Sequence, residues 1–443
     1  MGKLLGIDIG TSSCKAALFD LDGTVTAWSS QPYPVYYPNP GWAEQDPEEW
    51  WQAVCLCIRE VLQTSGVDAC EIKGIGVDGQ SGSTIPIDVH GRVMHNTPIW
   101  LDTRGAGICR KAGDRIGEDR IFSLCGNPLK PSYCTPKILW FQQQLPDVYQ
   151  NTYKFLQSNS FIVYRLTGKW SQDLSQGYGF HFFNMRSGSY DGAMCDAFGL
   201  HMEKFPEIFP CHGIVGEVTG AAAELTGLKK GTPVVAGGLD AACGTLGAGV
   251  VREGQTQEQG GQSGGMSICV AEPRGHRKLI LGYHVVPHRW LLQGGTTGGG
   301  GSMKWLKQTI GQTDESFEDL DLQAGSIPPG SDGLLFLPYL AGERSPLWNE
   351  NASGVFFGLS YDKPRGHLVR AVLEGVAYSL RHNLETAREA GVGAMELRAM
   401  GGSANSRLWT QIKADVTGKP IAVPSSDTAT TLGAALLAGV GTG

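Results

Sequence analysis

A short segment near the N-terminus carries residue types that bind phosphate. Asp8 lies near the end of an apolar run, Gly10, Thr11, Ser12 and Ser13 follow it, and Lys15 comes just after. Read with a period of two residues, the runs 4–9 and 16–19 are strands, so the segment between them is the tip of a β-hairpin. Such a tip can aim N–H groups and hydroxyls at phosphate oxygens, while a carboxylate holds Mg²⁺ through water. The alternative is a tight turn that needs glycine, with Lys15 a solvated strand residue.

Asp240 is the best candidate for a general base. It follows the apolar run 233–236 and two glycines, so its carboxylate lies at the carboxyl end of a strand with space for a substrate. Its neighbours Leu239 and Ala241 add no competing charge. The structural alternative is an aspartate that caps the small-residue helix expected after it.

The elements around these residues predict an α/β protein in two similar halves. Asp46 and Pro47 are typical of a helix start, and further helices are expected at 106–116, 366–389 and 407–416. The chain then repeats its opening layout, because QEQGGQSGGMSICV at 257–270 reads as strand, Gly/Ser turn and strand. Two such halves facing each other would form a cleft with a Gly/Ser/Thr tip on each side.

Composition limits the class of protein. The chain has 443 residues, which predicts two or three domains, and a net charge of −7 without a basic tract, so we expect no nucleic-acid partner. No run approaches the ~20 apolar residues that span a bilayer, so we expect no membrane partner and a cytoplasmic location. The 11 cysteines are scattered without CxxC pairs, which predicts reduced and mostly buried thiols.

Several segments, in order along the chain, resemble motifs of the FGGY family of carbohydrate kinases, within the superfamily of sugar kinases, Hsp70 and actin. They are GIDIGTSSCKAALFD, GWAEQDPEEWW, WLDTR, VVAGGLDAACGTLGAG, YLAGERSPLWNENASGVFFGL, HLVRAVLEGVAYSLRHNLE and GGSANSRLWTQIKADVTGKPIAVP. Xylulokinases and related pentulose kinases are the subgroup that they resemble most. The resemblance implies two ribonuclease H-like α/β domains, at 1–248 and 249–443, flanking an interdomain cleft for ATP and a sugar.

The resemblance also implies the roles of individual residues. It implies ATP-dependent phosphorylation of a sugar hydroxyl, with Asp240 as the general base and Asp8 as the Mg²⁺ residue. The expected sugar pocket contains Gln80, Ser81, Trp100, Asp102 and Asp240, and an ion pair with Arg104 is the alternative for Asp102. The expected nucleotide-binding residues are Gly10, Thr11, Ser12, Ser13 and Lys15 in the first domain and Gly261, Gln262, Ser263, Gly298, Gly401, Gly402 and Asn405 in the second.

Two departures from the xylulokinase pattern leave the sugar open. Ser81 and Gly82 stand where xylulokinases usually carry Met-His, and Ala241 stands where they commonly carry Asn. A ketopentose such as D-xylulose is the expected substrate, and kinases for ribulose, gluconate, glycerol or a rarer ketose are alternatives. A non-catalytic ATP-binding regulator of the same fold is another alternative. Family members continue past the GAALLAG helix, so we expect a shortened C-terminal domain, and a homodimer is left open.

Overall fold

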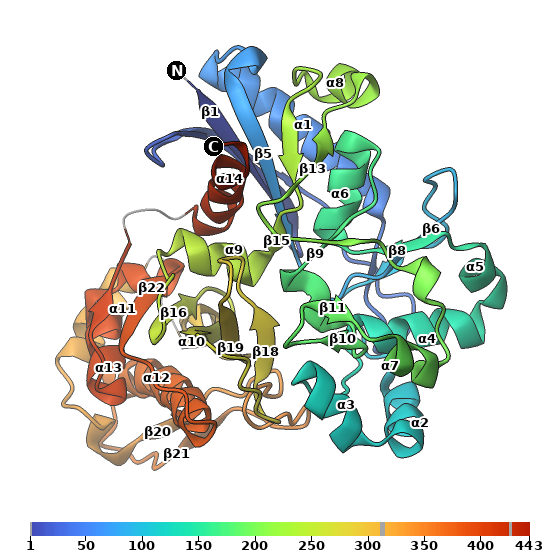
Figure 1. Ribbon diagram of the computed structural model, residues 1–443. Helices are drawn as coiled ribbons and strands as arrows, with labels where there is room; N and C mark the ends of the chain where they lie inside the picture. The colour runs from blue at the N-terminus through green and yellow to red at the C-terminus, as the bar shows by residue number, and fades with distance from the viewer. Residues whose placement is uncertain (1, 311–314, 425–427) are drawn as a thin grey trace. The chain divides into compact units, whose positions relative to one another are not determined.

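The computed structural model describes residues 2–310, 315–424 and 428–443, which form two compact units (Figure 1). The first unit comprises the chain up to Gly249 together with residues 282–289 and 428–443. The second comprises residues 250–281 and the described residues from 290 to 424.

A twisted sheet of seven strands forms the centre of the first unit, in the order β13-β14-β5-β1-β2-β3, with β15 also paired to β5. The hairpin expected at the N-terminus is present as β1 and β2, which pair antiparallel. Strand β5 pairs parallel with β1, so both strands end at the same edge. The bounds are β1 Lys3–Ile9, β2 Ser13–Asp20, β3 Val25–Pro32, β5 Ile72–Gly79, β13 Ile214–Glu217, β14 Pro233–Val235 and β15 Gly238–Leu239.

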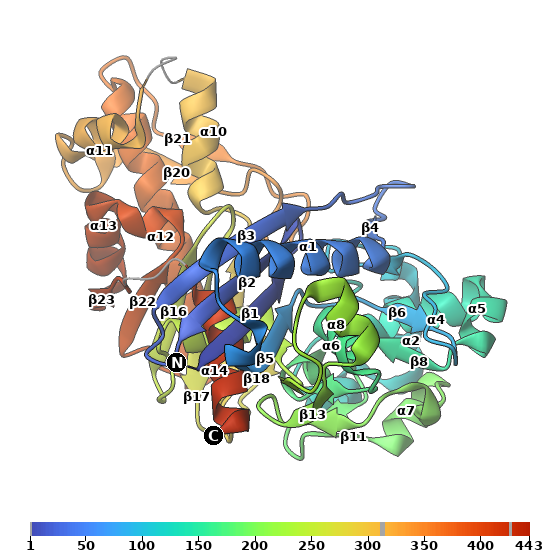
Figure 2. The same ribbon diagram turned by 90° about the horizontal axis from the view of Figure 1, so that it is seen from above.

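Helix α1 (Pro47–Ser65) covers one face of β2 and β3 (Figure 2). Its start is as the sequence predicts, because the Asp46 side chain accepts a hydrogen bond from the N–H of Glu48 at 2.9 Å. Trp50, Val54 and Ile58 form its buried stripe. The stripe packs on the apolar face of the sheet, which leaves the opposite face for other helices.

That opposite face of β1 and β5 is covered by α14 (Ala429–Thr442), the last helix of the chain (Figures 1 and 2). Gly6 and Gly76 permit this, because a Cβ on either would lie 1.9 Å from a carbonyl oxygen of α14. Helix α9 (Asp240–Gly247) packs on α14 in the same way, since a Cβ on Gly433 would lie 2.0 Å from the carbonyl oxygen of Cys243. Glycine thus brings the N-terminal end of α14 to the edge where β1 and β5 end.

The second unit is built on a six-stranded sheet in the order β18-β19-β17-β16-β22-β23. The hairpin expected at 257–270 is present as β16 and β17. Helix α12 packs on α13 and on β17 and β19. The bounds are β16 Gln255–Gly260, β17 Gly264–Val270, β18 Ile280–Tyr283, β19 Trp290–Thr296, β20 Leu335–Leu337, β21 Val355–Phe357, β22 Glu396–Met400, β23 Ile421–Ala422, α10 Gly300–Ile310, α11 Phe317–Gly325, α12 Arg365–Glu389 and α13 Arg407–Thr417.

Shorter elements complete the first unit. They are β4 Glu44–Gln45, β6 Ile85–Ile87, β7 Thr97–Pro98, β8 Lys154–Leu156, β9 Gln172–Asp173, β10 Phe183–Asn184, β11 Ser189–Tyr190, β12 Ile208–Phe209, α2 Ala106–Ile116, α3 Glu118–Cys125, α4 Cys134–Gln144, α5 Pro146–Asn151, α6 Ser158–Thr167, α7 Gly192–Phe198 and α8 Gly220–Thr226.

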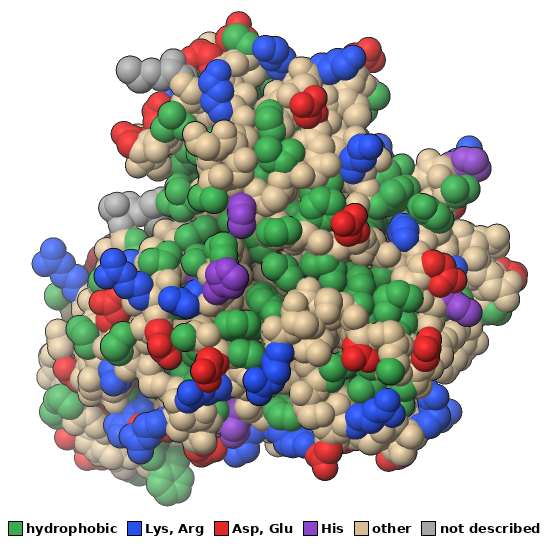
Figure 3. Space-filling view, viewed as in Figure 1, with side chains coloured by type: hydrophobic (Ala, Val, Ile, Leu, Met, Phe, Trp, Pro, Cys, Tyr) green, Lys and Arg blue, Asp and Glu red, His purple; other side chains and the backbone are tan. Residues whose placement is uncertain are grey.

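Three features of the structure can be compared with the composition: membrane-spanning helices, cysteines and surface charge. Across residues 2–310, 315–424 and 428–443, no helix has the length and apolar character needed to cross a bilayer. All 11 cysteines are free thiols, and most are buried, as expected. Acidic and basic side chains are interspersed on the face drawn in Figure 3.

Candidate active site

Three carboxylates lie at the edge where β1, β5 and β15 end. Asp8 on β1 and Asp78 on β5 are direct register partners, so their side chains lie on the same face of the sheet. Asp240 follows β15, which pairs with the last residues of β5. Asp78 is fully buried and Asp8 is 4 % exposed. Sequence reasoning missed Asp78, and the signal that could have found it is an acid at the end of a buried apolar strand.

The environment raises the pKa of two of these carboxyl groups. Burial, followed by the nearby charge of Asp8, raises the pKa of Asp240 to about 7, against the opposing effect of the Ala241 N–H, which donates to its Oδ1 at 2.6 Å. Burial and then Asp8 also raise the pKa of Asp78 well above its usual range. A carboxyl group with a pKa near 7 is matched to accepting a proton at neutral pH.

Asp8 itself is held by two groups and keeps one oxygen free. Its Oδ2 accepts a hydrogen bond from the Thr430 hydroxyl at 3.1 Å and lies 3.6 Å from Nζ of Lys15. Its Oδ1 is buried and has no hydrogen-bond partner, and the same is true of both oxygens of Asp78. Thr430 lies at the start of α14, so the C-terminal helix supplies a contact that spacing near Asp8 could not reveal.

The hairpin tip lies beside residues expected in the sugar pocket. The Trp100 indole N–H donates to the Thr11 hydroxyl at 2.9 Å, and the carbonyl of Thr11 accepts from the Gln45 side chain at 2.8 Å. Gln45 in turn accepts from Nε2 of Gln80 at 2.7 Å. Oε1 of Gln80 remains buried without a partner, so this side chain has an acceptor free for a ligand hydroxyl. Trp100 therefore contacts the tip directly, and Gln80 contacts it through the side chain of Gln45.

The other tip residues have backbone contacts. Gly10 donates its N–H to the carbonyl of Ser13 at 3.1 Å, and its own carbonyl accepts from the Tyr33 hydroxyl at 2.6 Å. Ser12 accepts from the N–H of Tyr33 at 3.2 Å through its carbonyl. Ser81, next to Gln80, is partly exposed.

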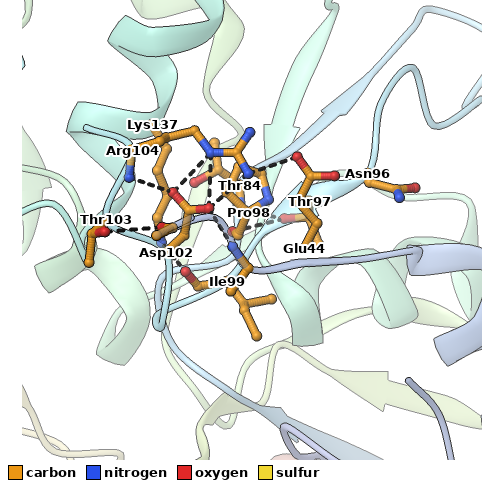
Figure 4. A network of polar contacts seen from close by, with 12 residues as sticks. Glu44, Thr84, Asn96, Thr97, Pro98, Ile99, Asp102, Thr103, Arg104 and Lys137 are labelled. Atoms are coloured by element: carbon orange, nitrogen blue, oxygen red, sulfur yellow. Dashed lines mark hydrogen bonds and ion pairs between the residues drawn. The ribbon is translucent and has the colours of Figure 1, made fainter. Parts of the chain in front are cut away.

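Asp102 belongs to a buried polar network (Figure 4). Its two oxygens accept from the guanidinium of Arg104 at 2.7–2.9 Å, and Oδ2 also accepts from the N–H of Ala43 at 2.8 Å. Arg104 contacts Glu44 at 2.7 Å as well, and its guanidinium lies 3.9 Å from the ring centroid of Trp42. The ion pair kept as the alternative for Asp102 is therefore present, and its oxygens already have donors.

In the second unit, the expected phosphate-binding tip adjoins the glycine tract that leads into α10. Gly300 donates to the carbonyl of Gly261 at 2.7 Å, and Gly301 donates to the carbonyl of Gln262 at 3.0 Å. A Cβ on Gly264 would lie 2.7 Å from the carbonyl oxygen of Gly298. The tip, including the neighbouring Ser263, is thus packed backbone to backbone on the start of α10, whose first N–H groups donate to carbonyls of the tip.

The segment expected to bind adenosine lies against the same tip. A Cβ on Gly401, whose φ is +83°, would meet the backbone of Gly260 at 3.0 Å. Nothing lies within 4 Å of a Cβ built on Gly402, which leaves open space there, and Asn405 ends this turn. Ser403 contacts the buried ammonium group of Lys413 at 2.8 Å, and Lys413 pairs with Glu258 of β16 at 2.8 Å.

The donor set suits Mg²⁺ better than a metal with an all-protein ligand cage. Among the described residues, no three His, Cys, Asp or Glu side chains are grouped so that they could hold a metal ion. Mg²⁺ keeps several waters and takes one or two carboxylates plus substrate phosphates. Oδ1 of Asp8, buried and without a partner, fits that requirement, and Asp78, whose pKa is raised by burial and by Asp8, would release its proton where it also contacts the ion.

Comparison with known proteins shows to which family the chain belongs. Models of the N-terminal and C-terminal domains of the FGGY family of carbohydrate kinases match residues 3–247 and 275–442. The chain belongs to this family. It is therefore a carbohydrate kinase, with ATP as its phosphoryl donor, and the predicted kinase activity is confirmed.

Full-length relatives of this kinase agree with that assignment. A xylulose kinase of Staphylococcus epidermidis is 34% identical over 443 residues, covering 99% of this chain and 88% of the relative. A gluconokinase of Bacillus subtilis is 29% identical, with 99% and 88% covered. The crystal structure of a xylulose kinase from Rhodospirillum rubrum superposes with a TM-score of 0.93 at 31% identity, covering 100% of this chain and 90% of that one. The α/β two-domain sugar-kinase fold is confirmed.

Proposed function

We propose that this kinase transfers the γ-phosphoryl group of ATP to a hydroxyl of a ketopentose, with D-xylulose as the first substrate. The observation that carries the proposal is Asp240, a partly exposed carboxyl group at the end of β15 whose pKa is raised to about 7. Several relatives are xylulose kinases, and this chain matches them over most of their length, which supports the choice of sugar. The gluconokinase relatives keep gluconate as the second candidate.

Asp240 acts as the general base in this proposal. As the sugar oxygen attacks phosphorus, its proton passes to a carboxylate oxygen of Asp240, and the N–H of Ala241 holds that side chain in place. The unpartnered Oε1 of Gln80 accepts a sugar hydroxyl, and the ring of Trp100 forms a wall of the pocket. Ser81 borders the same pocket. Asp102 borders it indirectly, through the chain segment that the ion pair between Asp102 and Arg104 holds in place.

Each half of the sequence contains residues that we propose as contacts for ATP. In the part at 1–248, Gly10, Thr11, Ser12, Ser13 and Lys15 contact phosphate oxygens with N–H groups, hydroxyls and an ammonium group. In the part at 249–443, the phosphate contacts come from Gly261, Gln262, Ser263 and Gly298, and the adenosine contacts from Gly401, Gly402 and Asn405.

Asp8 would hold Mg²⁺ through its free oxygen, with Asp78 beside it. The ion supplies charge neutralisation on the phosphate oxygens when it is bound. The protein's own part is to keep these carboxylates buried and in fixed register at the end of β1 and β5.

Two further expectations from the sequence stay predictions: that the protein forms a homodimer, and that it is located in the cytoplasm.

A sugar panel tests this function directly. ADP release by the purified chain is measured by a coupled assay with D-xylulose, ribulose, gluconate, glycerol and rarer ketoses. The expected result is the highest kcat/KM for D-xylulose. A higher value for gluconate would replace the proposed substrate, and no acceleration by any sugar would favour the ATP-binding regulator.

A further inference from the structure

Lys137 on α4 is a fully buried lysine whose ammonium group donates to backbone oxygens. Its ammonium group donates to the carbonyl of Gly82 at 2.6 Å, of Ile99 at 2.7 Å and of Ser132 at 2.9 Å. An ammonium group has three N–H donors, so this arrangement uses all of them. Figure 4 shows Lys137 beside Ile99 and Asp102.

The carbonyl groups belong to segments that border the proposed sugar pocket. Gly82 follows Ser81 after the end of β5, and Ile99 immediately precedes Trp100. Gly82 has a φ of +68°, and a Cβ there would lie 2.4 Å from the carbonyl oxygen of Ser132 and 3.2 Å from Nζ of Lys137. The segments therefore meet at one point, and the lysine is the group that joins them.

The surroundings make this contact sensitive to pH. Burial, the largest effect, lowers the pKa of Lys137 to about 8, while the neighbouring charges of Asp102 and Arg104 act in opposite directions. Cys134 and Cys109 also face it, and burial raises the pKa of these thiols to about 11 and about 12, so they remain protonated near pH 8. Above a pH of about 8 the lysine loses one of its three donors, and one carbonyl loses its partner.

We propose that Lys137 is a positioning residue for the sugar: it sets the separation between the Gln80–Gly82 segment and Trp100 and thereby controls sugar affinity. The inference rests on the proposed function, because it takes these segments as the walls of the sugar pocket. It assigns no contact between Lys137 and the sugar. Lys137 lies in the first unit and the proposed adenosine-binding residues lie in the second, so KM for ATP should change much less than KM for the sugar.

The first measurement uses the wild-type protein. KM for D-xylulose and KM for ATP are determined from about pH 6.5 to about pH 9.5 by the coupled ADP assay. We expect KM for the sugar to rise by up to about tenfold as pH passes about 8, with KM for ATP nearly constant. A flat sugar KM across this range overturns the inference, and this arm needs no variant that must fold.

The second measurement uses Lys137→Met, with Lys154→Met as the matched control. Both remove an ammonium group that donates to backbone carbonyls, which for Lys154 are those of Glu203 at 2.6 Å and Phe205 at 3.1 Å. We expect Lys137→Met to have a sugar KM about tenfold higher that no longer changes with pH. Lys154→Met should keep the wild-type sugar KM and its pH dependence. A rise of both KM values together in Lys137→Met would show general loosening and overturn the inference.

The proposed function and the inference fail differently. No ADP release with D-xylulose at neutral pH refutes the proposed function and the inference with it. Normal D-xylulose turnover with a pH-independent sugar KM refutes only the role of Lys137.

Discussion

Replacing Asp240 with asparagine should make the protein more stable while it removes most of the activity. The pKa of this group rises from 3.8 to about 7 on folding, because burial and the charge of Asp8 oppose its ionised form. At about 1.4 kcal/mol for each pKa unit, the ionised carboxylate destabilises the fold by ~4 kcal/mol above neutral pH. Asparagine removes this charge and keeps an acceptor for the N–H of Ala241, which contacts Oδ1 at 2.6 Å.

The net gain is smaller than that figure. Asp240 is partly exposed, so water screens the wild-type charge, and an amide N–H left without a partner costs up to ~1–3 kcal/mol. We therefore expect the free energy of unfolding of Asp240→Asn to exceed that of the wild type by ~1–3 kcal/mol at pH 8. The sign follows from the direction of the shift: a raised carboxyl pKa means that wild-type stability falls as pH rises toward about 7 and is then constant.

Urea unfolding at several pH values, followed by tryptophan fluorescence, measures the effect. The advantage of Asp240→Asn should grow from about pH 5 to about pH 8, and turnover should fall by about 10²–10⁴-fold while ATP still binds. Asp88→Asn is the control with the opposite sign, since the backbone N–H groups of Arg92 and His90 lower the pKa of Asp88. A variant that is less stable at every pH, or an advantage that does not change with pH, would refute the reasoning.

Three further substitutions test other parts of the structure. Gly76→Ala should lower the free energy of unfolding by about 3 kcal/mol or more, because its Cβ would meet the Ala434 carbonyl at 1.9 Å, and an unchanged urea midpoint would contradict the packing of α14. Arg104→Lys should cost ~1–3 kcal/mol in the same assay, since lysine cannot keep the paired bonds to Asp102 and the contact with the indole ring, and wild-type stability would argue against that network. Asp78→Asn should weaken Mn²⁺ binding in the presence of ADP by about tenfold in electron paramagnetic resonance titrations, and unchanged affinity would exclude this carboxylate from the metal site.

Local sequence patterns predicted the elements that carry the site. The hairpin tip at Gly10–Ser13 follows from period-two strands on either side, and the start of α1 follows from Asp46 and Pro47. Both depend on residues close in sequence, so spacing and turn chemistry suffice. Asp240 could be selected for a similar reason, since it follows a short apolar strand and two glycines.

Contacts between distant residues decided the rest. Asp78 acquires a raised pKa and lies beside Asp8 only because β5 pairs parallel with β1 in one register. Thr430 reaches Asp8 because glycines let the last helix lie on the backbone of the first strands. The sequence alone determined the family, the fold class and the candidate residues. The tertiary structure decided which buried groups keep a free atom for a ligand, because desolvation and hydrogen-bond satisfaction depend on neighbours that sequence order does not reveal.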